Sequence, residues 1–166
     1  MAVLPQMLRD EQHRTKAERN EHFAISLDKA DPTQENWAVT AAFYSALHYV
    51  EQFFVKHGTP CGNHEERNEQ FKKDVRIKQA YPYYSYLASL SHDARYKCTA
   101  LPTEVFEKHA KPQLAAVKKQ IDHALKLADG GIAATAAALS PQEKTKKALA
   151  TVDPPKPMPG KPKTKD

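Results

Sequence analysis

Apolar residues recur every three or four positions along most of the first 130 residues, which is the spacing of one face of an α-helix. The segment after Asp31 has two such faces, one formed by Val39, Phe43, Leu47, Val50 and Phe54, the other by Trp37, Ala41, Tyr44, Ser45 and His48. A helix that is apolar around so much of its circumference is usually central in a bundle. The pattern therefore predicts a central helix in this part of the chain.

Capping residues predict where the second and third helices begin. A first helix is expected over residues 6–29, with a clear apolar stripe only near its end. Asp31 precedes Pro32, and its carboxylate is placed to accept the free backbone N–H groups of a second helix. Asn63 predicts the cap of a third helix, which should continue to about residue 79.

Prolines and glycines divide the second half of the chain. After an interruption at Pro82, a helix is expected to resume over residues 83–93. Pro112 should bend or restart the last helix, because its ring clashes with the carbonyl four residues earlier. The apolar stripe of that helix ends at Gly130, the predicted C-terminal cap. Four or five helices with short connections predict an all-α fold, an antiparallel up-and-down bundle.

Composition separates the C-terminal end from the rest. Residues 1–130 are predicted to form the bundle, and residues 131–150 a marginal helix or linker. Residues 151–166 are rich in proline and lysine with almost nothing apolar, which predicts a disordered tail. Residues 141–166 hold seven lysines against three acidic residues, and thus +4 of the total charge of +5. The bundle itself is close to neutral, so the net charge does not indicate a nucleic-acid-binding surface on it.

Several classes of protein are disfavoured. No apolar run approaches the roughly 20 residues that span a bilayer, and the first residues lack the pattern of a secretory signal. His57, Cys61 and His64 are capable of binding metal, but they lack the paired spacing of zinc sites, and Cys98 is isolated. The expectation is a cytoplasmic protein with no membrane segment, metal or cofactor.

Candidate chemistry gathers in three short stretches, residues 37–48, 64–67 and 91–96. If the second and third helices are neighbours, these stretches meet, and the candidate binding residues are Tyr44, His48, His64, Arg67, Arg95 and Tyr96. Guanidinium groups bind phosphate oxygens in pairs, and aromatic faces stack on bases. The same residues also suit a buried polar network that fixes the packing of the bundle.

The order of these stretches resembles that of HEPN domains. The residues that carry the resemblance are Trp37, the run Phe43 to His48, His64-x-x-Arg67, and Ser91-x-x-Ala94-Arg95-Tyr96. It covers roughly residues 20–127. The resemblance implies a bundle of four or five helices that is commonly homodimeric and associated with nucleotide or RNA binding. Many HEPN members cleave RNA without metal, and prokaryotic members belong to defence and toxin modules.

The ribonuclease motif of the family is missing. In that motif a His follows an Arg after four to six intervening residues, whereas Arg9 and His13 are separated by three. Arg14 and His22 are separated by seven, and Arg19 and His22 by two. The absence favours a binding protein over an enzyme.

The leading hypothesis is a homodimeric HEPN-like domain that binds a nucleotide or RNA-type phosphate ligand, as an accessory of a defence or toxin–antitoxin system. One alternative is a metal-independent ribonuclease with an atypical site, in which His48 or His64 moves the proton and an arginine stabilises the phosphorane charge. Another is a structural protein-interaction bundle, in which Arg67 and Arg95 are both locked in carboxylate pairs.

Overall fold

The computed structural model of the chain describes residues 3–97 and 101–138. Within these ranges the chain contains helices and no strand, which confirms the all-α prediction. The helices are α1 (Val3–Ser26), α2 (Pro32–Lys56), α3 (His64–Lys73), α4 (Tyr81–Tyr96) and α5 (Lys111–Ala138). A 3₁₀ turn, Lys78–Ala80, leads into α4, and a π-helical turn, Phe106–Ala110, leads into α5. The residues up to Ala128 form one compact unit, and a second unit begins at Asp129.

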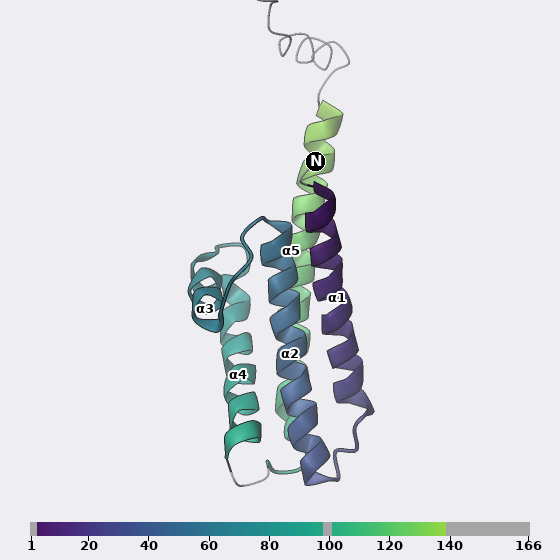
Figure 1. Cartoon of the computed structure of the whole chain (residues 1–166), viewed down its shortest axis with the longest axis vertical. Helices are drawn as coiled ribbons and strands as arrows, with labels where there is room; N and C mark the ends of the chain where they lie inside the picture. Colours follow the sequence, from purple (N-terminus) through teal and green to yellow (C-terminus); the bar gives the residue numbers. More distant parts are fainter. Residues whose placement is uncertain (1–2, 98–100, 139–166) are drawn as a thin grey trace, which may run out of the picture. The chain divides into compact units, whose positions relative to one another are not determined.

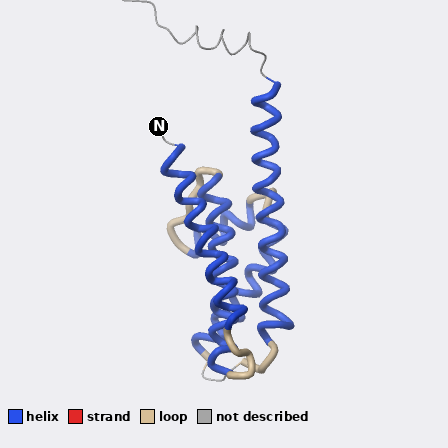
Figure 2. The backbone as a smooth tube through the Cα atoms, turned by 90° about the vertical axis from the view of Figure 1, so that its right-hand side faces the viewer, coloured by secondary structure: helices blue, strands red, loops and turns tan. Residues whose placement is uncertain are grey.

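The long helices of the first unit alternate in direction, as the predicted up-and-down bundle requires. In Figure 1, α1 runs down, α2 up, α4 down and the first part of α5 up, while α3 is a short helix beside the beginning of α4. The view in Figure 2 shows the same helices from the side, joined by short loops. The short connections are consistent with the antiparallel arrangement of neighbouring helices.

Both predicted N-terminal caps are confirmed. The Asp31 carboxylate accepts the backbone N–H of Thr33 at 2.8 Å, and α2 begins at Pro32. Asn63 Oδ1 accepts the backbone N–H of Glu66 at 2.9 Å, which starts α3. These bonds satisfy N–H groups that have no partner within the helix.

The predicted end of the third helix is wrong, because α3 ends at Lys73 rather than near residue 79. The carboxylate of Asp74 accepts the backbone N–H of Arg76 at 2.9 Å, so a local turn replaces the next helical turn. Pro82 also begins a helix instead of interrupting one, since α4 starts at Tyr81. A proline in the first turn loses no helical hydrogen bond.

The restart expected near Pro112 is confirmed. The backbone N–H of Lys111 bonds to the carbonyl of Phe106, five residues earlier, and Pro112 is the second residue of α5. The wider π-helical turn occurs where the ring of Pro112 would clash with the carbonyl of Lys108 in a regular α-helix.

The predicted cap at Gly130 is wrong, because α5 continues through it to Ala138. The residues after Gly131 are mostly alanine, which has the highest helix propensity, and this outweighs the cost of two glycines. Residues 131–138 of the predicted marginal helix or linker are therefore helical. Residues 139–150 and the predicted tail, 151–166, lie outside the described residues.

The core is built around α2, as predicted. The predicted stripe is buried, and so are Phe53 and Phe71. Helix α2 packs against α1 on one side and α4 on the other. On its second face Ser45 is buried and donates to the carbonyl of Ala17 at 2.8 Å, whereas Trp37 and Tyr44 are exposed.

Buried and half-buried polar contacts connect segments far apart in sequence. Glu35, fully buried at the start of α2, accepts the backbone N–H of Phe106 at 2.7 Å. Arg14 of α1 bonds to Asp122 of α5 at 2.5 Å. The first contact ties the start of α2 to the π-helical turn before α5, and the second ties α1 to α5.

Candidate functional site

Arg67, the first candidate arginine, is held by the protein. It lies on α3, is buried, and donates through Nε to the carboxylate of Glu51 on α2. Its Nη1 donates to His64 Nδ1 at 3.0 Å. The charge is already neutralised by a buried carboxylate, so Arg67 has little capacity left for a ligand.

Arg95, the second candidate arginine, is exposed on the last turn of α4. Its Nε donates to the carbonyl of Ser91 at 3.0 Å, and Nη1 lies 3.4 Å from the Tyr44 hydroxyl. The guanidinium lies 5.8 Å from the ring centre of Tyr44 and 5.0 Å from that of Tyr96. In the described part of the chain it has no carboxylate partner. Arg95 is therefore a positioned cation with donors available to an anion.

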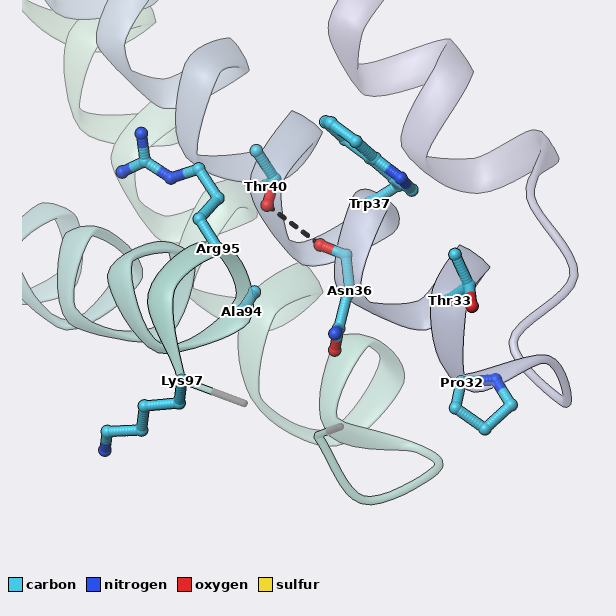
Figure 3. A pocket seen from close by; sticks show the side chains of 8 residues that line it. All are labelled: Pro32, Thr33, Asn36, Trp37, Thr40, Ala94, Arg95 and Lys97. Carbon is cyan, nitrogen blue, oxygen red and sulfur yellow. Dashed lines mark hydrogen bonds between the residues drawn. The ribbon is translucent and has the colours of Figure 1, made fainter. Parts of the chain in front are cut away.

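Arg95 also lines a cavity of about 350 Å³ between the first turns of α2 and the end of α4. The lining residues are Pro32, Thr33, Asn36, Trp37, Thr40, Ala94, Arg95 and Lys97. In Figure 3 the side chains of Trp37 and Arg95 extend from α2 and α4 toward the same side, with Thr40 between them. Trp37 is 56% exposed. An indole face and a guanidinium thus border one opening.

The other polar residues of the cavity are already partly engaged. Asn36 Oδ1 accepts the backbone N–H of Leu101 at 3.1 Å, which fixes the amide and leaves its Nδ2 donors. Thr40 donates to the carbonyl of Asn36 at 2.9 Å (Figure 3). Lys97 points away from Trp37 and pairs with Asp93 at 2.6 Å. Arg95 is therefore the cation best placed to bind an anionic ligand in this cavity.

His64 is fixed in one protonation form by Arg67. A guanidinium only donates hydrogen bonds, so His64 Nδ1 must be the acceptor and the ring proton lies on Nε2. Partial burial lowers the pKa of His64, and the charges of Arg67 and Arg95 lower it further. The imidazole is neutral at neutral pH, and its lone pair is already engaged. This arrangement does not suit a general base.

His48 pairs with a histidine of α1. Its Nδ1 lies 3.1 Å from Nδ1 of His13, so one ring donates and the other accepts. Burial lowers the pKa of His48 to about 4, and the charges of His13, Lys16 and Arg67 act in the same direction. Burial also lowers the pKa of His13. The pair is a neutral link between α1 and α2 at neutral pH.

This link predicts that acid weakens the bundle. The folded state holds both rings neutral, whereas the unfolded chain takes up these protons near the usual histidine pKa of about 6.5. The contribution of the histidine pair to the free energy of unfolding is fully present above that pH. It decreases as the pH is lowered toward about 4, the pKa of His48 in the folded state. We expect a smaller decrease in the free energy of unfolding, from about pH 7 to about pH 5, for a His13→Asn/His48→Asn variant than for the wild type.

Urea unfolding at several pH values measures this difference. The matched control is His22→Asn, which removes an exposed histidine from the same helix as His13 and should keep the wild-type slope. An identical slope in the double variant and the wild type would show that the pair does not govern the pH dependence.

The structure divides the six predicted site residues into groups. Arg95 contacts both Tyr44 and Tyr96, and Arg67 contacts His64. The two groups are close together. The ring centre of His64 lies 6.5 Å from that of Phe43, which precedes Tyr44 in the chain, and the charges of Arg67 and Arg95 both lower the pKa of His64. His48 faces α1 instead. The residue that sequence analysis did not include in the site is Trp37, although its spacing of seven from Tyr44 places both on one face of α2.

The zinc ligands considered in the sequence do not come together as a metal site. Among the described residues, no group of three or more His, Cys, Asp and Glu side chains could hold a metal ion. Burial raises the pKa of the Cys61 thiol to about 11, so the thiolate that zinc requires is disfavoured. Cys98 lies outside the described residues.

Comparison with protein-family models, with curated proteins and with solved structures finds no match to this chain. None of the helices described is both long enough and apolar enough to cross a membrane. The functional argument therefore depends on the geometry of the residues themselves.

Proposed function

We propose that this chain is a HEPN-like domain that binds a nucleotide or single-stranded RNA through its phosphate and base. The ligand contacts Arg95 and Trp37, with Tyr44 and Tyr96 beside them. The domain acts as a homodimer and as an accessory of a defence or toxin–antitoxin system, in keeping with the resemblance of its sequence pattern. Binding, and not catalysis, is its role.

The observation that carries this proposal is the environment of Arg95. An exposed guanidinium with no carboxylate partner among the described residues lines a cavity that also contains an exposed indole. A phosphate satisfies the guanidinium with charge-assisted hydrogen bonds, while a base stacks on the indole at a favourable free energy of about 1 to 3 kcal/mol. The cavity of about 350 Å³ is within the size range of small-ligand sites.

The ribonuclease alternative is less well supported. It requires a histidine with a free lone pair close to an arginine that is free to stabilise charge. His64 accepts from Arg67 through Nδ1, and His48 pairs with His13. Arg67 is neutralised by Glu51.

The alternative of a structural interaction bundle predicts that both arginines are locked in carboxylate pairs. Arg67 meets this condition through Glu51, whereas Arg95 has no such partner in the described part of the chain. The two arginines therefore have different roles. Arg67 stabilises the junction of α2 and α3, and Arg95 is left for the ligand.

The chain contains a single tryptophan, so the fluorescence of Trp37 reports directly on the cavity. We expect AMP and a short oligoadenylate to quench it at physiological salt, with the RNA left intact in the presence of EDTA. Arg95→Ala should weaken binding about tenfold, since a hydrogen-bonded charge contact contributes about 1.5 kcal/mol or more.

Arg19→Ala is the matched control, because it removes the same charge from an exposed position on α1. It should bind like the wild type. Absence of quenching by either ligand would refute the proposal, as would an Arg95→Ala titration equal to that of the control. Cleavage of the oligoadenylate by the wild type would favour the ribonuclease alternative instead.

A further inference from the structure

A second, larger cavity of about 700 Å³ lies between α5 and the segment that joins α3 to α4. It is lined by Arg76, Gln79, Lys119, Gln120, Asp122, His123, Lys126 and Leu127. Lys119, His123 and Lys126 are spaced four and three residues apart, so they form a stripe on one face of α5. None of the residues that line this cavity is tryptophan, tyrosine or phenylalanine, and the ring among them is the small imidazole of His123, in contrast to the indole in the cavity beside Trp37.

The positive charge of this cavity is only partly neutralised. Its one lining carboxylate, Asp122, is bonded to Arg14. In the described part of the chain, neither Lys119 nor Lys126 has a carboxylate partner. The cavity therefore keeps an excess of cationic groups, on a bundle whose charge is otherwise close to neutral.

Arg76 is held in place at the opposite wall of the cavity. Its Nε and Nη2 bond to the two carboxylate oxygens of Asp74 at 2.9 and 2.5 Å. The guanidinium also lies over the ring of Phe53, 4.8 Å from its centre. The remaining donors on Nη1 have no partner among the described residues. A fixed guanidinium loses little conformational entropy when it binds an anion.

We propose that this cavity is a second anion site, which binds a short polyphosphate chain. Lys119 and Lys126 on one wall and, on the other, the Nη1 donors of Arg76, whose charge is paired with Asp74, match an anion with several charged phosphates better than a single phosphate. The amides of Gln79 and Gln120 add donors at its edge. Because His123 is the one ring that lines the cavity and no tryptophan, tyrosine or phenylalanine does, a nucleoside attached to the chain adds little affinity. The site is independent of the one at Arg95.

Isothermal titration with inorganic tripolyphosphate at physiological salt tests this assignment on the full chain. We expect binding that is stronger than that of orthophosphate and, when ATP is titrated into the Arg95→Ala variant to exclude the first site, is matched but not exceeded by ATP. A Lys119→Gln/Lys126→Gln variant should bind tripolyphosphate about tenfold more weakly, since two charge contacts are lost. Arg95→Ala should leave this affinity unchanged.

The charge-matched control is Lys108→Gln/Lys111→Gln, which lowers the net charge equally at positions that do not line the cavity. It should bind like the wild type, because screening limits the reach of exposed charges to about 8 Å. The proposal is overturned if tripolyphosphate does not bind, or if the control variant weakens binding as much as the cavity variant. Binding of a polyglutamate peptide as tight as that of tripolyphosphate would indicate an acidic-peptide site instead. In the Arg95→Ala variant, ATP binding more than tenfold tighter than tripolyphosphate would indicate a nucleotide site here and would also refute it.

Discussion

Replacing Glu51 with glutamine should lower the free energy of unfolding by about 4 kcal/mol. The side chains of Glu51 and Arg67 are only 6% and 9% exposed, so the substitution leaves a guanidinium buried without a counter-charge. Removing one partner of a buried ion pair costs about 3 to 5 kcal/mol, because the remaining charge keeps its desolvation penalty. Urea unfolding at neutral pH measures the effect.

Two further variants separate the pair from its surroundings. A Glu51→Gln/Arg67→Met variant should be more stable than Glu51→Gln alone, because the uncompensated charge is gone. Glu107→Gln, which breaks the exposed pair with Lys111, should change the free energy of unfolding by no more than about 1 kcal/mol. If Glu51→Gln costs no more than Glu107→Gln, the assignment of Arg67 to stability and not to ligand binding fails.

Phe71→Ala should also lower the free energy of unfolding by about 4 kcal/mol, and it should release α3 from the bundle. Phe71 is fully buried, and its ring centre lies 5.5 Å from that of Tyr81 and 5.4 Å from that of Tyr84. Helix α3 has ten residues, of which Arg67 and Phe71 are buried. A short helix depends on such contacts, because isolated helices of this length are marginal in water.

Hydrogen exchange distinguishes loss of α3 from a general loss of stability. The amides of α3 should exchange much faster in Phe71→Ala, while those in the middle of α2 keep most of their protection. Phe23→Ala is the control, since its ring on α1 is 49% exposed and its removal should affect stability little. Wild-type exchange rates in α3 of Phe71→Ala would show that other contacts hold the helix.

The helices were predictable where the signals are local. Asp31 and Asn63 act through groups two or three residues away, so their caps can be identified from spacing alone. The end of α3 was not predictable in the same way, because Lys73 and Asp74 continue a polar run with no glycine or proline. The turn there depends on Asp74 bonding to Arg76.

The candidate site was predictable only in part, because the role of each arginine depends on contacts with residues that are distant in sequence. Tyr44 and Arg95 were expected to meet, and they do, at a separation of 51 residues. The same reasoning could not show that Glu51 neutralises Arg67, since an acidic residue within a helix is usually solvated. Only the packing of α3 onto α2 buries both groups together.

The bond from Phe106 to Glu35 has a consequence for the order in which the bundle forms. It joins residues 71 positions apart, so the intervening chain must already be compact before the bond can close at a modest entropic cost. The hairpin of α1 and α2 brings together neighbours in sequence and can assemble early. We therefore expect the π-helical turn that precedes α5 to bond to Glu35 at the start of α2 late in folding, after the hairpin of α1 and α2 has formed.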